Sequence, residues 1–324
     1  MAICRICSNS SLNMSYVARE MMFGYRDEFE YFECSNCGCL QILDIPSNLS
    51  KYYPENYYSF KSKCSYEDDR NPLTIFADKQ RAKYYLGYGS FLGNILSKRR
   101  HPLSRYEGSS LHFFDWLRVA KVKLNYKILD VGSGAGNLLL NLHKNSFSSL
   151  TGVDPFIEND IAYENGVKIF KRELNQIQEK FDFVMLNHSF EHMPEPLTTL
   201  KELWHILKPN RFALIRIPVA SSFAWREYQT NWVQLDAPRH LFLHTVESMK
   251  MLAEQANFKT KEIIFDSIEY QFSASEKYVR NIPQSCDDES LKLTQEELMS
   301  FREKADELNK NNDGDQACFY LYKP

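Results

Sequence analysis

The sequence has no apolar run long enough to cross a membrane and no excess of positive charge. A membrane-spanning helix needs about 20 consecutive apolar residues, whereas the apolar stretch 212–220 is far shorter and contains Arg216. Lys and Arg number 39 against 42 Asp and Glu, for a formal charge of −3. The composition therefore offers no overall basic field to nucleic acid or an anionic membrane. We expect neither a membrane span nor a nucleic-acid partner.

Low-complexity segments and internal repeats are also lacking. The 324 residues include 12 Gly and 12 Pro, with 44% hydrophobic and 25% charged residues, which is typical of a folded chain and not of a disordered one. The first residues, MAICRICSNSS, carry cysteines where a secretion signal has an apolar core. We therefore expect a cytoplasmic protein. The sequence makes no prediction of its oligomeric state.

Four of the eight cysteines form two C-x-x-C pairs separated by 26 residues. They are Cys4, Cys7, Cys34 and Cys37. Two such pairs supply the four thiolates of a tetrahedral structural zinc site, and a site with four protein ligands leaves no open position for chemistry. Disulfides are the competing interpretation, and a cytoplasmic location disfavours them. The pattern predicts a structural zinc ion.

The pattern of apolar residues divides the chain into three parts. Residues 1–45 are predicted to form a small zinc ribbon with extended runs at 15–17 and 29–33. Residues 46–125 are predicted to be a helical linker and lid. This second part is expected to have helices within 75–96 and 111–122. Its tyrosines 52, 53, 57 and 58 either form a lid over the cofactor or pack between the first part and the next. Residues 126–324 are predicted to be the catalytic domain.

Short β-rich runs alternate with helical ones from residue 126 onward. The expected strands are 127–131, 150–153, 167–170, 181–186, 212–219, 260–265 and 317–322. The expected helices are 138–143, 196–207, 246–256 and 294–310, the third with Thr245 as its N-cap. This alternation predicts an α/β domain built on a seven-stranded, mostly parallel, Rossmann-like sheet.

A glycine-rich turn follows the first of these strands, in ILDVGSGAG. Gly132, Gly134 and Gly136 stand where a strand ends and a helix begins, which is where ligands bind in open α/β sheets. Asp154 ends the next strand and can accept hydrogen bonds from ribose hydroxyls; the alternative is that it caps a turn with Pro155. Asp130 precedes the turn, where a carboxylate disfavours a pyrophosphate and suits a cationic sulfonium. This combination fits S-adenosylmethionine.

With ILDVGSGAG, TGVDP and FDFVMLNHSFEHMPEPLTTLKELWHILKPN in this order, residues 120–324 resemble the class I S-adenosylmethionine-dependent methyltransferases. The resemblance implies an enzyme with cofactor contacts from Asp130, Gly132, Ser133, Gly134, Gly136, Asp154, Asn187 and His188. It places the adenine near Glu173 and Leu174 without a motif that fixes the contact. Arg211 departs from the glycine usual in the family.

The segments CRIC, CSNCG, YYPENYYSF and WVQLDAPRHLFLHT are similar to a subgroup with a zinc ribbon. This subgroup occurs among sugar and small-molecule methyltransferases of surface-polysaccharide and natural-product pathways. The similarity implies a small-molecule, sugar-like acceptor. We expect methylation of a hydroxyl or carbon of a nucleotide- or lipid-linked sugar.

Segment 232–244 is the richest in side chains that can handle an acceptor. We predict His240 as the general base and Arg239 as the ligand of an acceptor phosphate or carboxylate. The alternative is that both pack before the helix that starts at residue 246. His192 is a further catalytic candidate, with a histidine bonded to backbone at a helix start as its alternative; Glu191 shares this ambiguity.

Three other functions compete with sugar methylation. An RNA base methyltransferase can also carry a zinc ribbon, but residues 1–45 hold more acidic than basic side chains, which disfavours RNA. A quinone-pathway O-methyltransferase would lack the ribbon and the PRHL segment. A non-catalytic binding module is the third, and the intact glycine turn with Asp154 argues against it.

Overall fold

The computed structural model describes residues 2–54, 70–89, 91–97, 113–286 and 293–324. Tyr57, Tyr58 and the first two residues of the predicted helix 111–122 lie outside these ranges. Within them, no helix combines the length and the apolar character needed to span a membrane.

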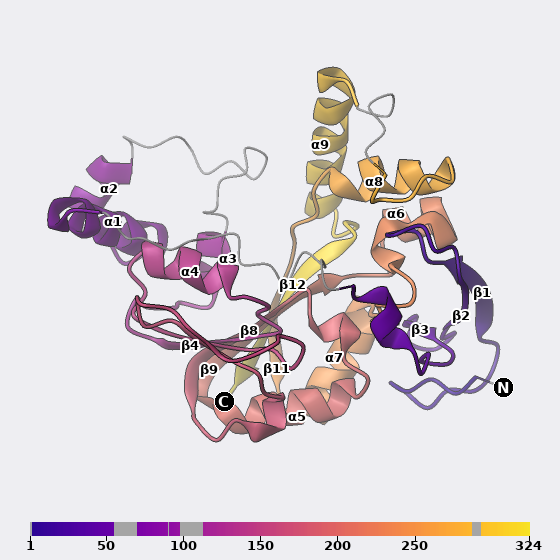
Figure 1. Ribbon diagram of the computed structural model, residues 1–324, viewed down its shortest axis with the longest axis horizontal. Helices are drawn as coiled ribbons and strands as arrows, with labels where there is room; N and C mark the ends of the chain where they lie inside the picture. Colours follow the sequence, from indigo (N-terminus) through magenta and orange to yellow (C-terminus); the bar gives the residue numbers. More distant parts are fainter. Residues whose placement is uncertain (1, 55–69, 90, 98–112, 287–292) are drawn as a thin grey trace. The chain divides into compact units, whose positions relative to one another are not determined.

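Strands and helices alternate along most of the described chain (Figure 1). The strands are β1 Met14–Arg19, β2 Glu28–Glu33, β3 Leu40–Ile42, β4 Lys127–Val131, β5 Ser149–Val153, β6 Ile161–Ala162, β7 Lys168–Phe170, β8 Phe181–Asn187, β9 Leu207–Pro218, β10 Phe242–Leu243, β11 Lys259–Phe265 and β12 Gln316–Lys323. The α-helices are α1 Pro72–Tyr85, α2 Phe91–Ser97, α3 Phe113–Val119, α4 Asn137–Lys144, α5 Pro196–Ile206, α6 Phe223–Tyr228, α7 Val246–Gln255, α8 Tyr270–Val279 and α9 Gln295–Lys310.

The larger sheet has eight strands in the order β11-β12-β9-β8-β4-β5-β7-β6. Strand β4 pairs in parallel with β5 and β8, and β5 pairs in parallel with β7. The sequence predicts seven of these strands; the eighth, β6, has two residues and pairs antiparallel with β7, so the sheet is mixed. Two residues are too short for a periodic pattern to show. The prediction of seven strands was therefore one strand too few.

The chain separates into two compact units, each considered by itself. Unit 1 comprises Met1–Pro54, His188–Leu200 and Arg216–Phe319, and unit 2 comprises Glu55–Asn187, Lys201–Ile215 and Tyr320–Pro324. Unit 2 contains β4 to β8 and the glycine turn. Unit 1 contains the four N-terminal cysteines and the segment 232–244. The predicted candidates for cofactor binding, apart from His188, thus lie in unit 2, and those for acceptor chemistry lie in unit 1.

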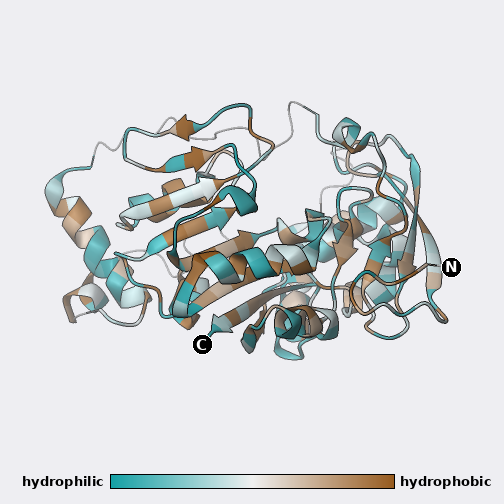
Figure 2. Cartoon of the chain, turned by 90° about the horizontal axis from the view of Figure 1, so that it is seen from below, coloured by the Kyte–Doolittle hydropathy of each residue, from teal (hydrophilic) through white to brown (hydrophobic). Residues whose placement is uncertain are grey.

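Unit 2 is built on strands whose side chains are buried on both faces. Ile128 and Leu129 in β4 are both fully buried, as expected for a parallel strand covered on both sides. Helix α4 buries Leu139 and Leu142 from its apolar side. Figure 2 shows hydrophobic colouring over much of the strands, while the helices carry both colours. This packing holds the carboxyl end of β4, where the glycine turn begins.

Unit 1 holds a second, four-stranded sheet in the order β1-β2-β3-β10. β1 pairs antiparallel with β2 from Met14 opposite Glu33 to Arg19 opposite Glu28. β3 pairs with β10, so that Leu40 faces Leu243. The extended runs predicted at 15–17 and 29–33 are present as β1 and β2, and the sheet also takes a strand from residues 242–243.

Helix starts follow the capping residues of the sequence. The side chains of Thr245 and Thr294 each accept a hydrogen bond from the third amide of their helix. In return, the side chains of Ser248 and Glu297 accept a hydrogen bond from the amide of the N-cap residue. The predicted N-cap of α7 is confirmed. The sequence interpretation did not identify α6 and α8, which follow β9 and β11.

Candidate metal centre and methyl-transfer site

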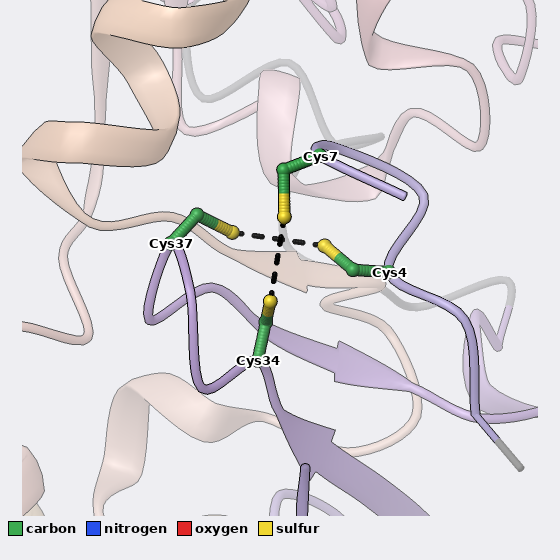
Figure 3. A group of neighbouring side chains, drawn as sticks. All are labelled: Cys4, Cys7, Cys34 and Cys37. Carbon is green, nitrogen blue, oxygen red and sulfur yellow. Dashed lines mark hydrogen bonds between the residues drawn. The ribbon is translucent and has the colours of Figure 1, made fainter. Parts of the chain in front are cut away.

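The side chains of the four N-terminal cysteines point toward one common centre (Figure 3). Cys4 Sγ lies 3.6 Å from Cys37 Sγ, and Cys7 Sγ lies 3.5 Å from Cys34 Sγ. All four sulfurs lie within 4.8 Å of one another, and all four cysteines are free thiols. Zn–S bonds of about 2.3 Å place the sulfurs of a tetrahedral site about 3.8 Å apart. The observed cluster fits a zinc ion, and the geometry gives no support to disulfides.

Backbone and amide donors surround this cluster. Gln41 Nε2 lies 2.9 Å from Cys4 Sγ, and the Ile6 amide lies 3.4 Å from the same sulfur. Gly38, directly after the second pair, has a φ of +68° and lets its amide donate to Cys34 O at 2.8 Å. Such outer contacts hold thiolates in place around a metal.

The glycine turn after β4 adopts the backbone that its three glycines permit. Gly132, Gly134 and Gly136 have φ values of +76°, +53° and +81°. A Cβ on Gly136 would lie 2.5 Å from Ile169 Cδ1, so space as well as conformation requires glycine there. Ser133 stands within the turn, and its amide donates to Val153 O at 3.3 Å. The turn thus brings backbone close to the end of β5, as a cofactor loop requires.

Asp154 fixes the turn from the end of β5. Its Oδ2 accepts a hydrogen bond from the Gly134 amide at 2.9 Å, and its Oδ1 accepts one from the Phe156 amide at 2.9 Å. The bond to Phe156 is the turn cap considered as the alternative to ribose binding. Phe156 itself is 72% exposed, which is unusual for a phenyl ring. The sequence interpretation did not single out Phe156; its position two residues after the acidic end of a strand was the available signal.

Asp130 carries a buried carboxyl group, and both effects that shift its pKa act in the same direction. Burial, and then the negative charge of Asp154, raise the pKa of Asp130 to about 8. The sulfonium and ammonium groups of S-adenosylmethionine would stabilise the charged form here. The site therefore fits a cationic ligand and disfavours a pyrophosphate.

The end of β8 carries Asn187 in unit 2 and His188, the next residue, in unit 1. His188 has a φ of +53°, a strained value for a residue other than glycine. Its Nε2 lies 2.7 Å from Arg216 Nη1, and Arg216 is held by Asp266 at 2.8 Å. Because Arg216 donates to Nε2, the neutral ring carries its proton on Nδ1. This Nδ1 lies 3.4 Å from Glu191 Oε1.

Glu191 is a fully buried carboxylate next to three histidines. Neither of its oxygens has a well-formed hydrogen bond within the described ranges of the chain. Burial raises its pKa, but the His188 ring and the charges of His240 and His192 outweigh burial and bring the pKa to about 2. The residue is therefore held as an anion inside the protein.

His192 and His240 lie side by side against Glu191. Their ring centroids are 4.7 Å apart, and His240 Nε2 lies 3.9 Å from Glu191 Oε1. His192 Nδ1 lies 2.9 Å from Arg239 O, and His240 Nδ1 lies 2.7 Å from Gln234 O. Burial, and then the charge of His240, lower the pKa of His192. The structure thus brings together two of the predicted catalytic residues.

Arg239 is fully buried in a network of ion pairs. Its guanidinium contacts Asp236 at 2.5 Å and Glu20 at 3.1 Å, and it donates to Tyr52 O at 3.2 Å. Arg239 thus joins Glu20 and Tyr52 of the N-terminal segment to the segment 236–240. Glu20 is a partner that the sequence pattern did not reveal, because it lies more than 200 positions away.

Two of the four lid tyrosines lie in the described part. Tyr52 is buried and donates to Asp27 at 2.7 Å, while Tyr53 contacts His192 Nδ1 at 3.2 Å. Tyr52 therefore packs within unit 1, as the packing interpretation predicts. Tyr53 reaches the histidine pair.

An open α/β sheet with a glycine turn and an acidic residue at the next strand end defines a class of proteins that bind nucleoside cofactors. Residues 79–263, more than half of the chain, match a family described as methyltransferase domain, and the chain belongs to this family. Membership confirms the predicted class of enzyme, a methyltransferase of EC 2.1.1.

Individual relatives are distant. The chain is 25% identical over 199 residues to cycloartenol-C-24-methyltransferase 1 of Oryza sativa subsp. japonica, covering 53% of this chain and 52% of that protein. The chain thus spans about half the length of the curated relative that it matches. Among solved structures, an S-adenosylmethionine-dependent methyltransferase of Mesorhizobium loti has a TM-score of 0.42, 14% identity and coverage of 66% and 98%. A structure of coclaurine N-methyltransferase with N-methylheliamine and SAH has a TM-score of 0.44, 11% identity and coverage of 69% and 73%.

Proposed function

We propose that this protein transfers the methyl group of S-adenosylmethionine to a hydroxyl or carbon of a sugar-like small molecule. The acceptor is a nucleotide- or lipid-linked sugar of surface-polysaccharide synthesis, and the reaction takes place in the cytoplasm. Membership of the methyltransferase-domain family supports the reaction class. The resemblance of the ribbon and of the segment 232–244 to sugar methyltransferases supports the acceptor.

The proposal that the cofactor is S-adenosylmethionine rests on the buried Asp130, which lies near Asp154 at the glycine turn. A carboxyl whose pKa burial raises to about 8 is stabilised when a cationic ligand arrives, and a sulfonium compound is such a ligand. In this proposal Asp130, Gly132, Ser133, Gly134 and Gly136 contact the methionine end. Asp154 binds the ribose, Asn187 and His188 flank the cofactor, and the exposed Phe156 ring covers the adenine.

The proposed handling of the acceptor rests on His192 and His240, which lie side by side in unit 1. Methyl transfer forms a bond from the acceptor oxygen or carbon to the methyl carbon and breaks the C–S bond, releasing S-adenosylhomocysteine, while the acceptor gives up a proton. His240 takes that proton at Nε2 when no cation is bound beside it, since its Nδ1 donates to Gln234 O at 2.7 Å. His192 lines the same space, 4.7 Å away between ring centroids.

Arg239 is better placed to hold this arrangement than to bind the acceptor. Its side chain is fully buried between Glu20 and Asp236, and its carbonyl oxygen fixes His192 Nδ1 at 2.9 Å. A buried guanidinium with paired carboxylates is stabilising only as long as its partners stay in place. We therefore assign Arg239 a positioning role in the proposed enzyme. The cysteine cluster holds structural zinc.

A labelling experiment tests the proposal. The protein is incubated with S-adenosylmethionine tritiated in its methyl group and with a cell extract that contains nucleotide sugars, lipid-linked sugars and total RNA. Label in the small-molecule or lipid fraction supports the proposal. Label in nuclease-sensitive material replaces it with RNA methylation, and cofactor binding without any labelled product supports a binding module.

The matched variants are His240→Ala and His205→Ala. His205 is exposed on α5 and serves as the control. We expect His240→Ala to lower kcat by about 10²- to 10⁴-fold with unchanged cofactor binding, the usual range for loss of a general base. His205→Ala is expected to keep normal turnover. Normal turnover in His240→Ala would remove the catalytic role.

A further inference from the structure

Three side chains of unit 1 form a second cluster with the composition of a metal site. Glu191, His192 and His240 each offer one ligand atom, and these atoms lie within 4.8 Å of one another. Glu191 and His240 are buried, and His192 is half-buried. Two imidazoles and one carboxylate are a donor set that first-row divalent cations accept, including catalytic zinc.

The backbone orients both imidazoles as metal ligands are usually oriented. Arg239 O lies 2.9 Å from His192 Nδ1, and Gln234 O lies 2.7 Å from His240 Nδ1. Because a carbonyl oxygen can only accept, each Nδ1 carries the proton and donates it. The lone pair of each neutral ring is therefore on Nε2. A carbonyl bonded to the opposite ring nitrogen is the usual outer contact of a metal-bound histidine.

Glu191 provides an independent observation. It is 0% exposed, and neither of its carboxylate oxygens has a hydrogen-bond partner in the part of the chain that the structure describes. A buried anion without well-formed hydrogen bonds is costly for a protein to keep. A cation held by Glu191 and the two imidazoles would compensate that charge. The rings of His188 and His240, at 3.4 and 3.9 Å from Oε1, are too far for normal hydrogen bonds.

We propose that Glu191, His192 and His240 bind a divalent first-row transition-metal cation, separate from the zinc of the cysteine cluster. Ligand atoms 2.0–2.2 Å from a metal lie at most about 4.4 Å apart, and the 3.9 Å between His240 Nε2 and Glu191 Oε1 is within this limit. Three protein ligands leave coordination positions open. The class of ligand that fills them is an acceptor with a hydroxyl and a neighbouring carbonyl or second hydroxyl, as sugars have.

This inference deepens the proposed function and rests on it for the identity of the acceptor. A cation at this position polarises the acceptor hydroxyl and lowers its pKa, so the O–H proton passes to bulk water. The oxygen then bonds to the methyl carbon as the C–S bond breaks. In the metal-bound protein His240 holds the cation and does not itself take the proton.

Manganese uptake tests the site without cofactor or acceptor. Mn²⁺ favours oxygen over thiolate ligands, so full-length protein that carries one zinc ion per chain, at the four-cysteine cluster, is titrated with Mn²⁺ and free Mn²⁺ is followed by electron paramagnetic resonance. We expect one Mn²⁺ per chain. Glu191→Gln, which keeps the shape and removes the charge, and His192→Ala are each expected to weaken binding at least tenfold. His205→Ala is the matched control and is expected to bind as the wild type does.

Circular dichroism and the thermal midpoint confirm that each variant is folded; if Glu191→Gln is not, His240→Gln replaces it. No Mn²⁺ uptake by the wild type, or full affinity in the folded variants, overturns the metal site. Methyl transfer that persists after the zinc-loaded protein is passed over a chelating resin, with no Mn²⁺ uptake, leaves the proposed function standing and rejects this inference. Mn²⁺ uptake without any methyl transfer supports the site and rejects the proposed function.

Discussion

The carboxyl group of Asp130 links cofactor binding to the pH. Its pKa in the folded chain is about 8, well above the ordinary value of 3.8, because of burial and the charge of Asp154. Below pH 8 the group is protonated in the free protein. A cationic cofactor favours the charged form, so binding expels the proton.

We expect S-adenosylmethionine binding near pH 7 to release close to one proton, and the affinity to rise with pH up to about 8. Calorimetry in buffers of different ionisation enthalpy measures the release. Asp130→Asn is expected to abolish it. Asp182→Asn is the control, because its pKa is lowered by Lys208 and Arg211 despite burial and the group is already charged at pH 7. Proton release unchanged in Asp130→Asn would remove Asp130 from the site.

The same group affects stability in the opposite direction from most carboxyls. The folded chain binds the Asp130 proton more tightly than the unfolded chain does, so this residue makes stability fall as pH rises from about 4 to about 8. Above pH 8 the full loss of stability has been reached. Asp130→Asn is expected to flatten this part of the pH profile, as measured by urea unfolding.

Substitutions of Gly136 and Gly166 distinguish the cost of a strained backbone from the cost of a steric clash. Both have positive φ, +81° and +88°, but a Cβ on Gly136 meets Ile169 Cδ1 at 2.5 Å while one on Gly166 meets nothing within 4 Å. Gly166→Ala is expected to cost about 1–2 kcal/mol for the left-handed backbone alone. Gly136→Ala is expected to cost more and to weaken cofactor binding. Equal midpoints of urea unfolding for the two variants would contradict this.

At the residue scale, local motifs predicted the geometry of their own residues better than isolated side chains predicted their surroundings. The cysteine pairs and the glycine turn place their ligand atoms through the backbone next to them, so spacing alone predicts their geometry. Arg239 differs, because its partner Glu20 comes from the distant N-terminal segment and satisfies its charge inside the protein. A sequence pattern records neither that pairing nor the lack of a hydrogen-bond partner for the Glu191 oxygens among the described residues.

Among the elements, strands in the centre of the large sheet followed the sequence closely. β4 and β8 are continuous apolar runs because both faces are buried, and their limits lie within a residue of those expected. β9 starts at Leu207, five residues before its apolar run, and its first part includes the exposed Pro209 and Asn210, which an apolar pattern does not mark. The helices that begin at capping boxes were predicted, whereas α6 and α8 were not.

Helix caps give a paired prediction at this scale. Thr245 and Thr294 each close a capping box, but Thr245 is 7% exposed and also donates to Cys37 O at 2.6 Å, whereas Thr294 is exposed. Thr294→Ala is expected to lower the free energy of unfolding by about 1 kcal/mol. Thr245→Ala is expected to lower it by more, since a buried acceptor beside the cysteine cluster loses its donor. Thermal unfolding of the two variants measures the difference, and a larger loss in Thr294→Ala would contradict it.

For the whole molecule, the cysteine cluster is expected to decide whether the small sheet of unit 1 exists. Structural zinc contributes folding free energy directly, and small zinc units unfold without it. Chelation, or Cys34→Ser, is expected to remove amide protection from β1, β2 and β3 and to leave that of β4 and β5 in unit 2. Hydrogen exchange measures both. Cys286→Ser, at an exposed cysteine outside the cluster, is the control, and protection of β1 to β3 that survives zinc removal would reject a structural metal.

The pairing of β3 with β10 also has a consequence for how the protein is made. Leu40 pairs with Leu243, so the N-terminal sheet cannot be completed until a strand roughly 200 residues later in the chain has been synthesised. At about 5–20 residues per second, a ribosome needs roughly 10–40 s to reach it. During that time one edge of β3 is open to pairing with other nascent chains. We expect early zinc capture by the cysteine pairs to protect the emerging chain, and zinc-starved cells to accumulate aggregated, newly synthesised protein before mature protein is lost.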